Sequence, residues 1–502
     1  MLRIRLGVQW WFCIALIFAM QQLSAQVTPD TTVQKQLSNF STDLFRFDSI
    51  RADSTKYVVS AVSFYGNKIT KQFILEREMM FHVGDTLSGA QFVKLSEQSR
   101  RNLLNTSLFN FVTVNTTVPY DSAATVHEII VVVNVKERWY TWPAPIFEVA
   151  EQNFNTWWRN GHNLQRATYG FYLWQYNFRG RKESVALICR FGYARQFGGQ
   201  YAIPYLNRRR TLGVTFTGLY TQSHEVAYAT RDNLLLFYKD RIHFIRNETS
   251  ASILFSYRQG IYVTHTLDFR YTNLFINDTV TRLASDYFVD SDHRMQYFSA
   301  SYHVVRDYRD IKAYPLKGHL EELEITKHGL GLLPTEKLDV FYVAVGLRKY
   351  AELLPRWFGA VMFRGRWMPG ATPPYYHQRA LGFGSYVRGY EYYVIDGQSY
   401  ALGKLSLRYQ LLKPHVFTIP YFPMEKFNTF HLAVYTGLFA DAAYVDDRAS
   451  VPSDHNYLGN TTLFGYGAGI DLVTYYDIVV RVEYSFNRQG ESGFFLHFGA
   501  GI

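Results

Sequence analysis

Segments that alternate apolar and polar residues recur through most of the chain, from Pro145 to its end. In residues 477–486 the apolar side chains fall on one face, whereas Arg481, Glu483 and Ser485 fall on the other. Side chains of a β-strand point alternately to its two faces, so this spacing predicts strands with one apolar and one wet face. The same pattern, with charges kept to one face, appears in four further segments: 183–193, 211–220, 265–271 and 400–410.

The composition favours lipid as the cover of the apolar face. Of the 502 residues, 17% are aromatic and only 19% are charged. Transmembrane barrels carry aromatic girdles at both membrane interfaces and few charges on the outer surface. After the N-terminal region there is no run of about 18 apolar residues, so a closed barrel is the remaining way to span a bilayer. The alternative is a large soluble β-sandwich rich in tyrosine, and the regular alternation argues against it.

The length of the alternating region fits about sixteen strands. Residues 145–502 number 502 − 144 = 358, so sixteen strands would take about 22 residues each with their connections, where a transmembrane strand needs roughly 9–11. Bacterial barrels normally have an even number of strands. Counting alone would accept fourteen or eighteen strands equally well.

The N-terminus predicts a secretory signal over residues 1–25. Arg3 and Arg5 form its positive region, residues 10–20 its apolar core, and Ser24-Ala25 a small-residue cleavage site. Residues 26–56 are polar and lack a steady period, which predicts a flexible segment. A secreted chain with a barrel is expected in the outer membrane of a Gram-negative cell, in contact with outer-membrane lipids.

The positive charge does not point to nucleic acid. The chain carries a formal net charge of +10, and its densest basic stretch is Arg208-Arg209-Arg210. That stretch follows a turn-like segment, and basic turns beside anionic headgroups are the preferred interpretation. There is also no Gly-x-Ser-x-Gly elbow, phosphate-binding loop or His-Glu-x-x-His motif. We therefore expect neither an enzyme, nor a cofactor, nor a metal site.

Residues 57–138 predict a small α+β domain ahead of the barrel. Gly66-Asn67 indicates a turn, and Thr70 is expected to cap a helix in which Phe73, Ile74 and Arg77 recur at helical spacing. Gly84-Asp85 should end that helix. The full expected order is strand, helix, helix, strand, strand, with the other elements at 58–64, 88–104, 109–116 and 126–135.

This order resembles a POTRA domain, the periplasmic module of the BamA/TamA family of outer-membrane barrels. The resemblance rests on Gly66-Asn67, Gly84-Asp85, Leu108-Phe109 and the exit segment 133–137. Such a module leaves an open sheet edge, with which an extended client or partner strand can pair through its backbone. The alternative is that the domain is only a spacer.

Two short motifs in the last quarter of the chain carry the functional argument. Val387-Arg388-Gly389-Tyr390 lies in a long segment, 368–399, that is rich in Gly, Pro and Tyr. Strands counted backward from a periplasmic chain end place this segment outside the cell. Asp441 lies on an alternating segment, 432–444. An arginine and an aspartate that both fall inside a barrel have a reason to pair.

These motifs are similar to a signature of the BamA/TamA family. Its members carry Val/Ile-Arg-Gly-Phe/Tyr at the tip of the sixth extracellular loop, which folds back into the barrel. The resemblance implies sixteen strands and a pair between Arg388 and the strand-thirteen aspartate, which Asp441 matches, although Ala443 stands where glycine is common. Gly465, Gly467 and Gly469 match the glycine-rich strand fourteen. The alternative is an ordinary salt bridge in the lumen without a tethered loop.

The resemblance implies a factor that assembles, inserts or translocates client proteins. The POTRA domain would bind an unfolded outer-membrane or secreted client, and a weak seam between the first and last strands would receive it. Accessory lipoproteins are further candidate partners. Gly493, Gly499 and Gly501 could weaken the last strand or simply curve it. The alternatives are a two-partner-type secretion pore for one exported protein, a passive channel or adhesin, and an outer-membrane enzyme.

Overall fold

The computed structural model describes residues 54–117, 127–149, 167–418, 429–449, 454–474 and 478–499. The expected signal segment 1–25, most of segment 26–56 and the final residues 500–502 lie outside the described residues. The chain divides into two compact units, Met1–Glu183 and Ser184–Ile502. Within the described ranges, no helix is both long and apolar enough to cross a membrane.

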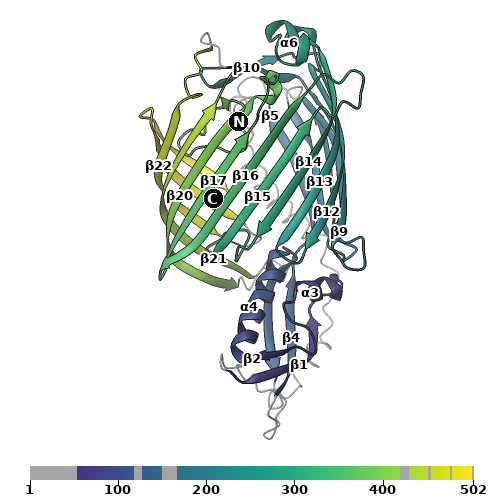
Figure 1. Ribbon diagram of the computed structural model, residues 1–502, viewed down its shortest axis with the longest axis vertical. Helices are drawn as coiled ribbons and strands as arrows, with labels where there is room; N and C mark the ends of the chain where they lie inside the picture. Colours follow the sequence, from purple (N-terminus) through teal and green to yellow (C-terminus); the bar gives the residue numbers. More distant parts are fainter. Residues whose placement is uncertain are drawn as a thin grey trace. The chain divides into compact units, whose positions relative to one another are not determined.

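The N-terminal module is a four-stranded sheet with two helices (Figure 1). The strand order is β2-β1-β4-β3, in which β1 and β4 run parallel and the other two pairs run antiparallel. This confirms the small α+β domain expected from the sequence, apart from the short strand β2, which was not foreseen. The elements are β1 Lys56–Tyr65, α3 Gln72–Glu78, β2 Thr86–Ser88, α4 Gly89–Asn105, β3 Phe109–Thr117 and β4 His127–Glu137.

Helix α4 begins where the sequence predicts it. The Ser88 hydroxyl accepts a hydrogen bond from the Gln91 N–H at 3.3 Å, and the Gln91 side chain accepts one from the Ser88 N–H at 3.0 Å. This reciprocal capping box satisfies two donors that a helix start otherwise leaves free. Phe92 and Leu103 then bury one face of the helix against the sheet.

The prediction that Thr70 caps the first helix is wrong. Helix α3 begins at Gln72, and its N-cap residue Lys71 makes no side-chain capping bond. The N–H and the hydroxyl of Thr70 both donate instead to Oε1 of Glu137, each at 2.6 Å. A helix start offers Thr70 only N–H donors, whereas the buried Glu137 carboxylate accepts charge-assisted bonds from both the N–H and the hydroxyl of Thr70, which holds the threonine at the end of β4.

The predicted turn residues lie in two turns, although α3 ends at Glu78, six residues before Gly84, so the expectation that Gly84-Asp85 ends the helix is wrong. Gly66 has φ +88°, and a Cβ there would lie 2.0 Å from the Val135 carbonyl oxygen. The Asn67 side chain donates to the Thr70 carbonyl oxygen at 3.1 Å. Gly84 also has positive φ, and the Asp85 carboxylate accepts from the His82 N–H at 2.8 Å. These contacts shape the two turns that flank α3.

Glu137→Ala is expected to destabilise the module by about 2–3 kcal/mol. Glu137 is buried and accepts hydrogen bonds from the N–H groups of Ile69 and Thr70 and from the Thr70 hydroxyl. Its loss would leave those donors without an acceptor, and hydrogen bonds to a charged acceptor contribute about 1.5–3 kcal/mol each. Faster trypsin cleavage within 57–138 of the full chain would report this loss. Glu128→Ala, at an exposed position on the same strand, is the control, and equal cleavage of both variants would contradict the prediction.

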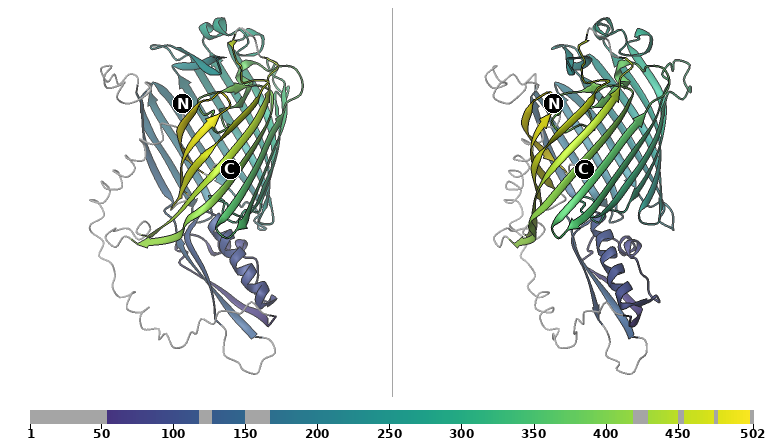
Figure 2. Two further views of the ribbon diagram at one scale, coloured as in Figure 1. Left: turned by 90° about the vertical axis from the view of Figure 1, so that its left-hand side faces the viewer. Right: turned by 60° about the vertical axis from the view of Figure 1, so that its left-hand side comes forward.

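The rest of the chain forms a sixteen-stranded antiparallel sheet that makes a barrel wall (Figures 1 and 2). This confirms the transmembrane β-barrel expected from the alternation. The first strand begins at Thr141, ahead of the expected Pro145. In sheet order the strands are β5 Thr141–Val149, β6 Ala167–Phe178, β7 Glu183–Gly192, β8 Ala194–Ile203, β9 Leu212–Ser223, β12 Arg246–Gln259, β13 Val263–Ile276, β14 Arg294–Asp307, β15 Gly318–His328, β16 Val340–Leu354, β17 Trp357–Trp367, β20 Ser399–Thr418, β21 Thr429–Asp446, β22 Thr462–Val473, β23 Val479–Asn487 and β24 Ser492–Phe498.

Exposure alternates along the barrel strands, as β20 shows. Leu405 and Leu407 are 53% and 37% exposed and belong to the lipid-facing side, whereas Lys404, Ser406 and Arg408 are buried. The expectation of a wet inner face is therefore wrong for this strand. The side chains of Lys404 and Ser406 are covered because a folded segment of the chain packs against them, through Tyr386 and Arg388.

That segment is residues 368–398, here called the inner loop, which connects β17 and β20, the eleventh and twelfth strands of the sheet. Its parts η3 Tyr375–His377, β18 Arg379–Leu381 and β19 Ile395–Asp396 give it regular structure, and β18 pairs with β19. Leu381, Val387, Tyr390 and Ile395 are each at most 2% exposed and form one core with barrel residues that include Leu402 and Leu463. Outside the wall, the connections also hold β10 Glu225–Arg231, β11 Leu234–Lys239, α6 Asp278–Leu283 and η2 Val289–Ser291.

Candidate functional site

The tip of the inner loop is a tight turn made by the predicted motif. The Tyr390 N–H donates to the Val387 carbonyl oxygen at 3.1 Å. Gly389 stands at the third position of this turn with φ +93°, which type II turns require and glycine adopts without strain. A Cβ at Gly389 would also lie 2.9 Å from the Phe486 carbonyl oxygen. The turn thereby points the Arg388 side chain toward the strands.

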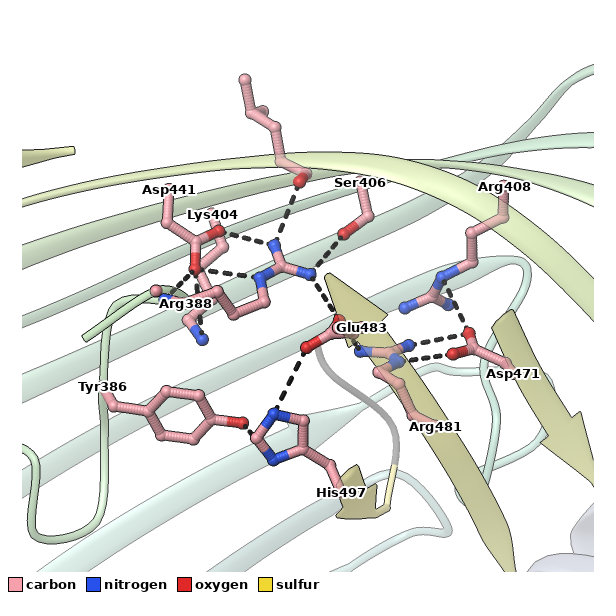
Figure 3. Close-up of polar contacts among 12 residues, drawn as sticks. Tyr386, Arg388, Lys404, Ser406, Arg408, Asp441, Asp471, Arg481, Glu483 and His497 are labelled. Carbon is pink, nitrogen blue, oxygen red and sulfur yellow. Dashed lines mark hydrogen bonds and ion pairs between the residues drawn. The ribbon is translucent and has the colours of Figure 1, made fainter. Parts of the chain in front are cut away.

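Arg388 is held by Asp441 through a bidentate ion pair (Figure 3). Arg388 Nε lies 2.9 Å from Asp441 Oδ2, and Nη2 lies 2.5 Å from Oδ1. The Arg388 backbone N–H adds a third bond to Oδ2 at 3.0 Å. The side chains are 2% and 0% exposed, so the pair is fully buried. The planar fork of donors matches a carboxylate, which makes this arrangement specific to arginine.

The remaining donors of Arg388 are also satisfied. Nη1 donates to the Ser406 hydroxyl at 3.3 Å, and Nη2 donates to the Leu405 carbonyl oxygen at 3.2 Å. The guanidinium carbon lies 4.0 Å from the centre of the Phe439 ring, within reach of a cation–π interaction. The loop tip is thus bonded to β20 and β21 at once.

Further charges extend the pair into a buried network (Figure 3). Lys404 Nζ lies 3.5 Å from Asp441 Oδ2, and Glu483 Oε1 lies 3.5 Å from Arg388 Nη1. Arg481 Nη1 reaches the same Glu483 oxygen at 3.5 Å and also pairs with Asp471 through Nη2 at 2.8 Å. Opposite charges alternate through the network, which lets each charge be buried beside a partner.

The connection between β14 and β15 contacts the other end of the network. Tyr314 in this connection donates to Asp471 Oδ2 at 2.5 Å. Arg408 lies over the Tyr314 ring at 4.8 Å, with its Nε 3.9 Å from the same Asp471 oxygen. A second connection of the barrel is therefore anchored to the inner face.

Lys404, Glu483 and Arg481 are site residues that the sequence did not reveal. Alternation predicts all three on the polar faces of their strands, but pairing depends on register. In the structure Lys404 lies opposite Asp441, and Asp471 lies opposite Arg481. These pairings could not be read from alternation, because alternation fixes only the face of a side chain and not the register between two strands.

The glycine-rich strand leaves room for neighbouring backbone. A Cβ at Gly465 would lie 1.8 Å from the Arg388 carbonyl oxygen, so the loop tip can reach β22 only because this residue is glycine. A Cβ at Gly467 would lie 2.1 Å from the Tyr484 carbonyl oxygen. At Gly469 the nearest atom is Glu483 Cγ, at 3.0 Å. Of the three predicted glycines, Gly465 serves the loop, and the other two serve the contact with β23.

Two other motif residues secure the tip through packing. Val387 is 1% exposed and belongs to the apolar cluster with Leu402, Ala443 and Leu463. Tyr390 packs into the same cluster, and its hydroxyl oxygen accepts a hydrogen bond from the Arg488 N–H at 3.3 Å. A buried tyrosine needs such a partner for its hydroxyl.

A hairpin outside the wall holds the inner loop from its other end. Asn233, between β10 and β11, accepts a bond from the Val394 N–H at its carbonyl oxygen, at 2.9 Å. Its side-chain Oδ1 accepts from the Leu458 N–H at 3.1 Å, and Asn233 is 1% exposed. No sequence signal pointed to this residue, because its partners lie more than 150 positions away.

The inner loop is expected to become less stable as pH rises through 6. Burial raises the pKa of Asp396 from its ordinary 3.8 to about 6, and the charge of Asp447 adds to the effect. A folded-state pKa above the unfolded value favours folding at low pH, and that contribution is lost as the group ionises. The two-unit shift corresponds to roughly 3 kcal/mol in all, and about half of it is lost between pH 5 and pH 8, because the carboxyl of the unfolded chain is already ionised at pH 5. Proteinase K should therefore cut within 368–398 faster at pH 8 than at pH 5.

Asp396→Asn should remove that pH difference. Asp339→Asn, at a side chain that is 81% exposed, is the control and should keep it. A protease-activity correction with unfolded casein at each pH is needed. If the variant and the parent protein show the same pH dependence, another group is responsible.

Two family descriptions match the chain. "Surface antigen variable number repeat", the POTRA family, matches residues 57–138, and the Omp85 superfamily domain matches residues 177–501. The second match covers more than half of the 502 residues. No curated protein matched the chain.

Solved structures of low sequence identity also resemble the chain. BamA from Haemophilus ducreyi lacking POTRA domains 1–3 is 17% identical, with 88% of this chain and 83% of that chain covered and a TM-score of 0.48. CdiB from Acinetobacter baumannii is 13% identical, with 89% and 74% covered and a TM-score of 0.45. CdiB from Escherichia coli is 11% identical, with 98% and 97% covered and a TM-score of 0.43.

Family membership therefore rests on the family match. The structural likenesses are too distant to add to it. The matched POTRA region coincides with the four-stranded module, and the matched superfamily domain covers the wall from the end of β6 to β24. The chain belongs to the Omp85 superfamily of outer-membrane insertion and translocation factors, as a β-barrel preceded by a POTRA domain.

Proposed function

We propose that this protein inserts or translocates client proteins at the outer membrane, with residues 57–138 in the periplasm. The module binds an unfolded client, and the barrel with its anchored inner loop passes the client on. The observation that carries the proposal is the buried pair of Arg388 and Asp441, which fixes a loop tip against β20, β21 and β22.

A passive pore has no use for this arrangement. Arg388 and Asp441 are each 1% exposed, and charges removed from water must be matched by partners with good geometry. A loop without a role in the lumen would remain in water, where its charges are solvated. The inner loop instead buries Val387 and Tyr390 as well, so it is a built part of the barrel interior.

The proposed client site of the module is the edge strand β3. It stands at the end of the sheet order β2-β1-β4-β3 and is nine residues long, which suits pairing with an extended chain. Backbone hydrogen bonds along such an edge bind a strand with little regard for its sequence. That property fits a factor that handles unfolded barrel proteins, in which strands of many sequences occur.

The proposed exit is between the strands at the two ends of the sixteen-strand order, β5 and β24. A client hairpin that pairs there has its backbone groups satisfied before it meets lipid. Burial of the client's apolar face then supplies the free energy, so no nucleotide and no catalytic step are required. Accessory lipoproteins would bind the periplasmic module.

Depletion of the protein, followed by an outer-membrane proteome, tests this function. An assembly factor should cause the loss of several barrel proteins. The loss of a single exported protein would favour a two-partner-type secretion pore instead. If the outer-membrane and exported proteins are unchanged, the protein is a channel or an adhesin and the proposal fails.

A further inference from the structure

Three side chains from separate elements converge beside the tethered loop tip: Glu391 of the inner loop, Glu483 of β23 and His497 of β24. One atom of each, Glu391 Oε1, Glu483 Oε2 and His497 Nε2, lies within 4.8 Å of the others. His497 Nε2 is 3.6 Å from the first and 3.4 Å from the second. None of these three atoms has a hydrogen-bond partner within the described part of the chain.

The other polar atom of each side chain is held by a neighbour. Glu391 Oε2 accepts a bond from the Gly389 N–H at 2.8 Å. Glu483 Oε1 faces the guanidinium groups of Arg388 and Arg481, each at 3.5 Å. These contacts turn the free oxygen of each carboxylate toward the common point.

His497 is oriented in the same way (Figure 3). Its Nδ1 lies 3.3 Å from the Tyr386 hydroxyl, and its ring stacks on the Tyr386 ring with centroids 5.4 Å apart. A metal-binding histidine usually donates its second ring N–H to an oxygen acceptor, which fixes the tautomer that coordinates. Tyr386 supplies such an oxygen and leaves Nε2 free.

Burial makes it costly to leave these three atoms without hydrogen bonds. The Glu483 side chain is 2% exposed, and the side chains of Glu391 and His497 are 12% and 15% exposed. A buried carboxylate oxygen without a hydrogen bond is destabilising. A cation at the common point would satisfy all three atoms at once.

The distances fit a zinc ion. Zn²⁺ binds nitrogen and oxygen ligands at about 2.0–2.2 Å in tetrahedral geometry, which separates neighbouring ligand atoms by about 3.3–3.6 Å. The two separations from His497 Nε2 are 3.4 and 3.6 Å. One imidazole and two carboxylates suit Zn²⁺ better than Mg²⁺, which prefers oxygen ligands alone.

We propose that Glu391, Glu483 and His497 bind one Zn²⁺ ion, with the fourth position open to water. The ion joins the segment after the loop tip to the last two strands of the sheet. It is a structural clamp, independent of the client-handling role. The sequence contains no zinc motif because its ligands come from three elements that only the fold brings together.

Zinc binding by the purified full chain in detergent tests the proposal. The protein should carry no polyhistidine tag and be stripped with a chelator, since its fifteen histidines already offer weak sites. Calorimetric titration with ZnCl₂ should show one ion bound per chain, and excess MgCl₂ should not compete. His497→Gln and Glu391→Gln should each weaken binding at least about tenfold. His303→Gln is the control, because this histidine lies in β14, the eighth strand of the sheet, and the variant should bind zinc as the parent protein does.

Heat-modifiable migration on a gel establishes that each variant has formed a barrel. X-ray absorption of the zinc-loaded parent protein gives a readout that needs no variant, and it should show one imidazole among nitrogen and oxygen ligands. A parent protein without a stoichiometric ion, or variants that bind as tightly as the parent, would overturn the proposal. In that case the cluster is a histidine–carboxylate ion pair.

Discussion

Arg388→Ala is expected to release the tip of the inner loop and to abolish client handling. The change leaves the buried Asp441 with Lys404 at 3.5 Å as its remaining partner among the described ion pairs. Breaking a buried pair costs about 3–5 kcal/mol, and this second cation places the expected cost near 3. That cost corresponds to a hundredfold or greater shift toward the released loop. The rate at which maleimide labels Val387→Cys, in a Cys189→Ser background, measures this shift. Val387 is 1% exposed, so the cysteine can react only when the loop tip leaves its place.

Arg388→Lys should behave almost like the alanine variant. A lysine keeps the charge but loses the fork that bonds both oxygens of Asp441 and also reaches Ser406 and the Leu405 carbonyl. Arg306→Ala is the control, because its pair with Glu321 is on exposed side chains and such pairs contribute about 0–1 kcal/mol. Maleimide labelling that stays slow in Arg388→Ala would show that the ion pair does not hold the loop.

Gly465→Val is expected to expel the loop without altering any charge. The added Cβ would lie 1.8 Å from the Arg388 carbonyl oxygen and 3.3 Å from Val387 Cγ1, so the turn cannot keep its place. Valine is otherwise favoured in strands, so the barrel itself should still form. The outer-membrane level of client proteins in a complemented depletion strain should fall as far as it does for Arg388→Ala.

Gly403→Val is the matched control for this change. Gly403 lies on β20, two strands from Gly465, and the nearest atom to its added Cβ is the Ala442 carbonyl oxygen at 3.9 Å. It should support normal client levels. If both glycine variants are impaired equally, loss of strand flexibility and not collision with the loop explains the effect.

Much of the barrel could be predicted from the sequence because alternation is a local property. Charges kept to one face of 400–410 and 477–486 indicated strands, and β20 and β23 lie there. Arg388 and Asp441 could be picked out because a contiguous motif and one polar position on a strand mark them. Their pairing was implied by the resemblance to the BamA/TamA family, because spacing and alternation place the two residues but do not bring them together.

The rest of the network depended on properties that the sequence does not display. Glu483 and His497 face a common point only because β23 and β24 pair in one register, with Arg481 opposite His497. Thr70 was assigned to a helix start by its position before an apolar helical pattern. The competing acceptor, Glu137, is 67 residues away and could not be weighed.

The cross-strand ion pairs bear on how the cylinder can deform. Lys404–Asp441 and Asp471–Arg481 each link two neighbouring strands through side chains as well as through the backbone ladder, and Arg388 and Glu483 join the two pairs. Sliding β20, β21, β22 and β23 past one another would separate opposite charges in a medium of low dielectric constant. These four strands should therefore move together as a rigid unit, and any widening of the barrel must be taken up by strain in the remaining strands.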